Sequence, residues 1–390
     1  MIAYNKTWLA NLRLQDEVKK DVQQGNVSDA EFNGIAQKYP VSFYTPNLFV
    51  RIGLFILTCV IMSFGDGLLT LMAASSRGLV ESAFWLFFLG ALAYAGLEIM
   101  INASHHYRSG VDDALLFICG CFFTTGFAVL LSNNNYGTHY LSLSGLIFLL
   151  TLWLSIRFAD MLAATTCCVA FLAFIFFAWI KIVPAGLSTA PFIMMLVSGG
   201  VYWVASVYSS RKEFINYDNC LIVAKAVSLT ALYASGNYYI IQTLSSEMMG
   251  KTGPVPFGAI FWIWTILMPF AYIGFGIKRK DVILLRVGLL LITAAALTFR
   301  TYYHVLPVDV ALTIAGTVIL TVVYAVVKYL KTPKHGFTYT EPDEVNLMDH
   351  LKVESLIVAE TFSHAPAAPT DEGVKFGGGD FGGGGSSGGF

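Results

Sequence analysis

The sequence predicts an all-α fold, a polytopic integral membrane helix bundle of about ten transmembrane helices with both termini in the cytoplasm. About ten apolar stretches are each near the roughly 20 residues that a helix needs to cross a bilayer. Charged residues make up 13% of the 390 residues and hydrophobic residues 56%, whereas roughly 25% of a typical soluble domain is charged. Lys and Arg are also concentrated on one side of the predicted membrane.

The basic residues orient these spans. The predicted spans are residues 48–73, 81–103, 112–132, 139–156, 161–180, 188–208, 219–243, 257–277, 281–299 and 307–330. With the N-terminus inside, the inner loops hold Arg108, Arg157, Arg211, Lys212, Lys278, Arg279 and Lys280, and the outer loops hold only Arg77, Lys181, Lys251 and Arg300. Because cytoplasmic loops are enriched in Lys and Arg, this distribution predicts that both ends of the chain are cytoplasmic.

Residues 1–47 are predicted to form a cytoplasmic helical hairpin. A helical stripe of apolar residues begins near residue 11, and Gly25 is placed to end the first helix. Ser28 and Glu31 have the spacing of a capping box, which starts a second helix that runs to Tyr39. The hairpin is too small to bury a core alone, so we expect it to pack on the inner face of the membrane domain or on a partner.

Two of the spans contain residues that disturb a helix. In the first span, Gly65-Asp66-Gly67 allows two interpretations: the helix ends near Phe64 and Asp66 lies in water, or the helix is broken at membrane depth. In the eighth span, Pro269 removes one backbone hydrogen bond and predicts a kink.

The chain after the last span divides into two parts. Residues 331–365 form a cytoplasmic segment in which 343–362 can make an amphipathic helix. Residues 366–390 are rich in Gly and are predicted to be a disordered tail, because such a segment buries too little apolar surface to offset the ordering of its backbone. An interaction tail is the alternative.

The run from Val18 to Tyr39 resembles the opening segment of an uncharacterised bacterial family of multi-span membrane proteins, domain of unknown function 2157. Members of that family have a short helical hairpin with a central Gly and a closing Tyr before many spans. The resemblance implies a bacterial inner-membrane protein. It carries over no catalytic or ligand-binding residue.

Charged residues inside spans are the strongest functional signal, because a charge at the bilayer centre costs about 2.5–3.5 kcal/mol on insertion scales. Glu98, Lys225 and Arg286 each lie a short way from the inner end of a predicted span. We therefore expect a polar cluster in a cavity open to the cytoplasm, in which Glu98 pairs with Lys225 or Arg286. The alternative is that the two cations extend to the lipid headgroups and Glu98 lies at the rim.

The sequence suggests no catalytic chemistry. It contains no nucleotide-binding glycine motif and no arrangement typical of hydrolysis, and its six Cys lie in or beside spans without the two-pair pattern of a zinc site. We therefore expect no enzyme activity, no cofactor and no metal site.

The composition leaves two functional classes. The first is a transporter-like protein with a cytoplasm-facing polar cluster. The alternative is a membrane scaffold or sensor that recruits protein partners through its cytoplasmic hairpin and Gly-rich tail. The lipid bilayer is the expected partner, and nucleic acid is not, because neither end carries a basic block. The small-molecule ligand and the oligomeric state stay open.

Overall fold

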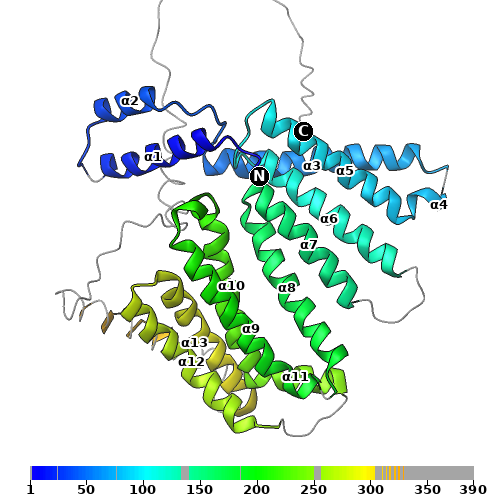
Figure 1. Cartoon of the computed structure of the whole chain (residues 1–390), viewed down its shortest axis with the longest axis vertical. Helices are drawn as coiled ribbons and strands as arrows, with labels where there is room; N and C mark the ends of the chain where they lie inside the picture. Colours follow the sequence, from blue (N-terminus) through cyan, green and yellow to red (C-terminus); the bar gives the residue numbers. More distant parts are fainter. Residues whose placement is uncertain are drawn as a thin grey trace, which may run out of the picture. The chain divides into compact units, whose positions relative to one another are not determined.

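The computed structural model describes residues 2–23, 25–75, 77–132, 140–184, 186–249 and 256–303, together with separate positions between 310 and 328. In this part of the chain all regular secondary structure is helical, and Tyr44 and His106 form one isolated β-bridge (Figure 1). The predicted tenth span, the segment 331–365 and the tail 366–390 lie wholly or mostly outside the described residues.

Nine helical segments of the described residues are long and apolar enough to cross a membrane, which confirms the all-α polytopic bundle. They are α3 (Leu48–Met72), α5 (Ala83–Asn102), α6 (Val111–Ser132), α7 (Tyr140–Phe158), α8 (Met161–Ile182), α9 (Gly186–Ser209), α10 (Asp218–Gly236) with the 3-10 turn η1 (Lys212–Tyr217) before it, α12 (Gly258–Arg279) and α13 (Val282–Tyr303). The short α4 (Arg77–Val80) connects α3 to α5.

Helices that follow one another in sequence form the main packing pairs. α5 packs on α6, α7 on α8, α9 on α10, and α12 on α13. α8 also contacts both α9 and α10, so these three lie side by side in Figure 1, and α10 continues the contact to α13. α3 packs mainly against α6 and leaves most of its surface exposed.

The N-terminal hairpin consists of α1 (Lys6–Gln23) and α2 (Asp29–Lys38). The predicted capping box is confirmed, since Ser28 accepts from the backbone N–H of Glu31 and the Glu31 carboxylate accepts from the backbone N–H of Ser28. Gly25, in the turn between the helices, has a positive φ of 78°, a conformation that Gly adopts at little cost. The hairpin buries little: Leu9 is the buried residue of α1, and α2 has none.

The first span follows neither of its two predicted interpretations. α3 continues through Gly65-Asp66-Gly67 to Met72, because the two glycines have right-handed backbone and open space around them. Asp66 is not in water; it is the one residue of α3 that is buried. Its backbone carbonyl accepts a hydrogen bond from the hydroxyl of Thr70 at 2.7 Å.

The seventh predicted span, 219–243, is wrong in its last seven residues. α10 ends at Gly236, and a separate helix, α11 (Tyr238–Met249), begins after Asn237. The Asn237 side chain, 2% exposed, takes part in this break: its amide donates to the hydroxyls of Tyr233 and Thr298, and its oxygen accepts from the N–H of Ile240. A helix can be interrupted at membrane depth when neighbouring side chains satisfy the freed polar groups.

Gly236 allows the other helices to approach this break. A Cβ at this position would overlap the Trp264 ring and the end of Met195. The hydroxyl of Thr265, in α12, accepts from the N–H of Tyr238 at 3.0 Å. Pro269 lies farther along α12, which continues to Arg279, and the predicted kink stays a prediction.

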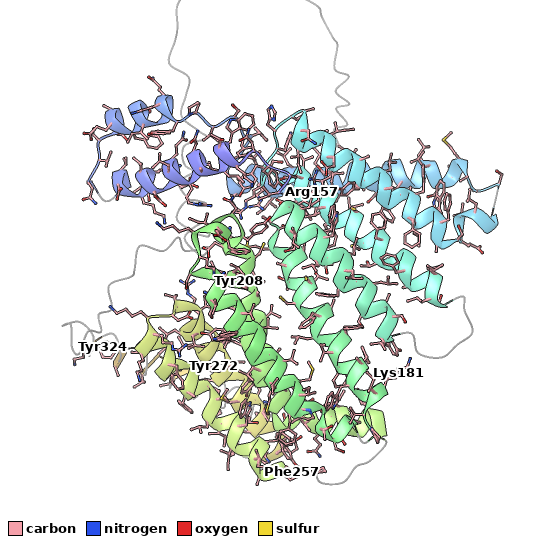
Figure 2. The ribbon with its side chains drawn as sticks, in the orientation of Figure 1. Arg157, Lys181, Tyr208, Phe257, Tyr272 and Tyr324 are labelled. Carbon is pink, nitrogen blue, oxygen red and sulfur yellow. The ribbon has the colours of Figure 1, made fainter. Side chains whose placement is uncertain are left out.

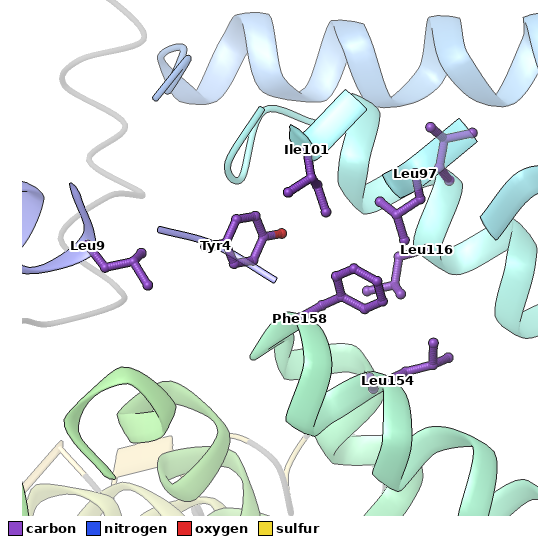
Figure 3. Close-up of a cluster of buried hydrophobic side chains, with 9 residues drawn as sticks. Tyr4, Leu9, Leu97, Ile101, Leu116, Leu154 and Phe158 are labelled. Carbon is purple, nitrogen blue, oxygen red and sulfur yellow. The ribbon is translucent and has the colours of Figure 1, made fainter. Parts of the chain in front are cut away.

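A cluster of buried apolar side chains lies where the N-terminal segment meets α5, α6, α7 and α8 (Figure 3). Its members are Tyr4, Leu9, Leu97, Ile101, Leu115, Leu116, Leu154, Phe158 and Ala163. Leu9 contributes from α1, outside the spans, where burying such a side chain stabilises by about 1.5–3 kcal/mol. We call this end of the bundle the hairpin end.

We predict that Gly236→Ala destabilises the protein and that Gly274→Ala does not. The new methyl group at Gly236 meets Trp264 and Met195, whereas a Cβ at Gly274 has no atom within 4 Å. Overpacking of this kind costs about 1–3 kcal/mol. Thermal unfolding of both variants in nanodiscs measures the difference, and equal melting temperatures would show that Gly236 is not needed for close packing.

Candidate functional site

A group of six polar side chains lies at the hairpin end and forms what we call the charged junction. Its members are Tyr4, Arg51, Arg108, Asp112, Asp113 and Asp160. They come from the N-terminal segment, the start of α3, the loop between α5 and α6, the first turn of α6, and the turn between α7 and α8. They line a cavity of about 20 Å³, which has room for about one water molecule.

Asp112 is the most buried carboxylate of the charged junction, at 3% exposed. Its two oxygens accept from the backbone N–H groups of Arg108 and Ser109, each at 2.8 Å, and from the Ser109 hydroxyl at 2.9 Å. These bonds resemble a capping box, in which a first-turn carboxylate reaches back to the residue that precedes the helix. Asp112 therefore starts α6 and fixes the preceding loop.

Asp113 joins α6 to α3 through an ion pair. The Arg51 guanidinium donates to Asp113 Oδ2 from Nε at 2.8 Å and from Nη2 at 2.7 Å. The two helices approach closely here, because a Cβ on Gly110 would overlap the backbone carbonyl of Arg51. Gly110 also has a φ of 94°, which residues with a side chain rarely adopt. A side chain at this position is therefore excluded both by the contact with Arg51 and by the backbone conformation.

Arg108 extends the charged junction toward α10. Its backbone lies in the left-handed region, with φ 49°, and its guanidinium stacks 5.4 Å from the centre of the Tyr107 ring. Both terminal nitrogens donate to the side-chain oxygen of Asn219 when that amide is oriented with its oxygen toward Arg108. The loop between α5 and α6 is thus tied to the first turn of α10.

Asp160 starts α8 and completes the charged junction. Its Oδ2 accepts from the N–H of Ala163 at 2.8 Å, as an N-cap side chain does. Burial raises the pKa of the Asp160 carboxyl above its ordinary value, while the hydrogen bond from Ala163 opposes that shift. The carboxylate has no ion pair within 4 Å among the described residues, so its charge is held chiefly by the helix terminus.

The N-terminal segment covers the charged junction. The Tyr4 ring packs edge-on against Tyr107 at 4.8 Å between centres, and its hydroxyl lies 3.5 Å from Asp112 Oδ2. Burial and the nearby carboxylate of Asp112 raise the pKa of Tyr4 well above its ordinary value, so the phenol stays neutral and donates. The N–H of Ala3 donates to the carbonyl of Arg157 at 2.8 Å.

The hairpin is attached to the bundle at a second place. The Arg13 guanidinium donates to the carbonyl of Ile215 at 3.1 Å and to the Asn216 side chain at 3.0 Å, both in η1. Between these contacts, Trp8 packs edge-on against His105 and Phe43. The hairpin therefore lies on the helix ends through one segment before α1 and one face of α1.

Glu98, a predicted site residue, lies in α5 and is paired with Arg157 of α7. The guanidinium donates to both carboxylate oxygens, with Nη2 2.9 Å from Oε1 and 3.1 Å from Oε2. The Tyr94 hydroxyl and the Asn102 amide donate to the same carboxylate at 2.9 and 3.1 Å. Figure 2 shows Arg157 at the hairpin end and Lys181, in the last turn of α8, at the opposite end.

The predicted pairing of Glu98 with Lys225 or Arg286 is therefore corrected: the cation that reaches Glu98 is Arg157. Lys225, in α10, donates to the hydroxyl of Ser209 at 3.0 Å, at the last residue of α9. The alternative, in which the cations extend to the lipid headgroups, stays a prediction. Arg286 lies in α13 and has a contact of its own. A cluster that unites all three stays a prediction.

The sequence analysis missed the charged junction, although its residues were visible. Asp112 and Asp113 begin an apolar stretch and Asp160 lies between two of them, and acidic residues at such positions ordinarily serve only the helix terminus. Arg108 precedes Asp112 by four residues and Arg157 precedes Asp160 by three, but Arg51 lies 62 residues from Asp113 and gave no local signal. Among the described residues, no group of three or more His, Cys, Asp or Glu side chains is arranged to hold a metal ion.

Comparison of the chain with protein-family models, curated proteins and solved structures returns no match.

We predict that Glu98 and Arg157 are energetically coupled and that Glu98 and Lys225 are not. A bidentate pair with further hydrogen bonds, partly shielded from water, should show a coupling of about 1 kcal/mol or more. The cycle compares Glu98→Gln, Arg157→Met and the double variant by unfolding in mixed micelles. The control cycle replaces Arg157→Met with Lys225→Met and should be additive within about 0.5 kcal/mol; coupling in that cycle alone would restore the original pairing.

We predict different effects for two substitutions of Asp160. Asn keeps an acceptor for the N–H of Ala163, so Asp160→Asn should match or exceed the wild-type stability at pH 7, whereas Asp160→Ala should lose about 1 kcal/mol. Because burial raises the pKa in the folded state, the folded protein holds this proton more tightly. The wild type should therefore lose stability as pH rises from about 3.8 through the raised folded pKa.

Thermal unfolding of the three proteins between about pH 4 and pH 7.5 measures both effects. The contribution of Asp160 to the pH dependence should disappear equally in Asp160→Asn and Asp160→Ala. If Asp160→Asn is as unstable as Asp160→Ala at pH 7, the charge of Asp160 is required and the N-cap explanation is wrong.

Proposed function

We propose that the protein is a bacterial inner-membrane scaffold or sensor whose N-terminal hairpin presents a recruitment surface to the cytoplasm. The single observation that carries the proposal is how the hairpin is held. Its attachment uses the segment before α1 and one face of that helix, while α2 has no buried residue. An element that was needed only to complete the bundle would bury more of its surface.

The distribution of basic residues supports the cytoplasmic orientation. Arg51, Arg108 and Arg157 lie at the hairpin end, and Lys278 and Arg279 close α12 in its last turn. At the opposite end of the described helices the chain is poorer in Lys and Arg. The positive-inside rule therefore assigns the hairpin end to the cytoplasm. The resemblance of Val18–Tyr39 to domain of unknown function 2157 supports the inner membrane as the location.

The cavity of the charged junction has the size of a structural contact. A cavity of about 20 Å³ has room for roughly one water and none for a solute. Its carboxylates instead hold loops and helix starts in place, and Tyr4 of the N-terminal segment lies against one of them, Asp112. The junction is suited to fixing the hairpin on the membrane domain.

We predict that a biotin ligase fused to the N-terminus of the full chain labels a reproducible set of cytoplasmic proteins in living bacteria. Asn33→Glu together with Gln37→Glu places new charge on the exposed face of α2, where neither residue contacts the bundle. This double variant should lose at least part of that set, because like charges and desolvated acids suppress binding. Quantitative mass spectrometry of the biotinylated proteins measures the change.

Lys19→Ala is the matched control, since Lys19 is exposed on α1 of the same hairpin. It should leave the labelled set unchanged. The same neighbours for all three proteins would show that α2 recruits nothing, and failure to label any cytoplasmic protein would overturn the orientation.

A further inference from the structure

A groove between α3 and α6 contains a buried carboxylate without a partner. Asp66 is 8% exposed and lines an opening of about 370 Å³. The other lining residues are Ser63 of α3 and Phe117, Ile118, Cys121 and Phe122 of α6. Among the described residues, no hydrogen bond or ion pair reaches the Asp66 carboxylate; the nearby hydroxyl of Ser63 donates to the carbonyl of Cys59.

Three carboxylates of α5 and α6 are compensated by the protein. Glu98 has Arg157, and Asp113 has Arg51. Asp112 accepts three hydrogen bonds from its own loop. A charge held away from water without such partners costs several kcal/mol. Among the described residues, Asp66 thus lacks the partners that these three carboxylates have.

The groove lies at membrane depth and faces the bilayer. Asp66 is six residues before Met72, the last residue of α3, or about 9 Å along the helix axis. Two residues of the groove wall are themselves open to the surroundings: Phe117 is 50% exposed and Cys121 is exposed, as suits contact with lipid. A molecule dissolved in the bilayer can therefore reach the groove directly.

We propose that this groove binds a lipid-soluble amine, whose ammonium group pairs with Asp66 and whose alkyl chain lies along α6. Charge complementarity identifies the ligand class, because no described residue supplies a cation to the Asp66 carboxyl. The volume is that of a small-molecule site. Phe117 and Phe122 line the groove and add apolar contact for the alkyl chain. The site shares no residue with the charged junction and does not depend on the proposed function.

The test uses the full chain in lipid nanodiscs and two matched photoreactive probes, dodecylamine and dodecanol that each carry a diazirine. The amine should crosslink to peptides that contain Ser63–Asp66 or Phe117–Phe122, and an excess of unlabelled dodecylamine should compete. Asp66→Asn, which is nearly isosteric and neutral, should reduce amine crosslinking about tenfold, equivalent to about 1.4 kcal/mol. Dodecanol crosslinking should be weak and should not change.

Two further variants keep the result decisive. Glu98→Gln removes a carboxylate that Arg157 already compensates, so it should leave amine crosslinking unchanged. Cys121→Phe fills the groove and retains Asp66, so it should abolish crosslinking of the amine even if Asp66→Asn were poorly folded. Equal crosslinking by amine and alcohol, or full amine crosslinking in Asp66→Asn or in Cys121→Phe, would overturn the proposal.

Discussion

Compensation of buried and half-buried carboxylates fixes how several helix ends meet at the hairpin end. A carboxylate away from water needs a cation or several N–H groups, since otherwise its desolvation costs several kcal/mol. At the hairpin end, arginines of other helices compensate Glu98 and Asp113, and backbone N–H groups compensate Asp112 and Asp160. These contacts join α3 to α6 and α5 to α7, and they fix the starts of α6 and α8.

The hairpin depends on the same contacts but adds few of its own. Ala3 binds the carbonyl of Arg157, whose side chain is held by Glu98, and Tyr4 lies over Asp112, which holds the loop beneath it. The position of the N-terminal segment therefore depends on charged residues of α6 and α7, to which Tyr4 and Ala3 bind. Because α2 buries none of its residues, the attachment leaves much of the hairpin surface available to other molecules.

The sequence predicted the features that are local and missed those that depend on distant residues. Hydropathy located most spans to within a few residues, and the capping box at Ser28 was visible because its two partners are three residues apart. The end of α10 could not be predicted, because Asn237 is satisfied partly by Thr298, 61 residues away. The partner of Glu98 was missed for the same reason, because Arg157 is 59 residues away. The sequence also placed Arg157 in a loop, whereas it lies in the last turn of α7.

The separations of these contacts along the chain also order the assembly of the protein during its synthesis. Trp85, the hydrogen-bond partner of Thr70, is synthesised only 15 residues after it. Asp113, the partner of Arg51, is synthesised 62 residues after Arg51. Ile215, whose carbonyl accepts from Arg13, is synthesised 202 residues after Arg13. The helices of the hairpin are therefore synthesised first but dock on η1 late. Until the chain up to α10 has been made, the translocon or a chaperone has to accommodate an undocked hairpin.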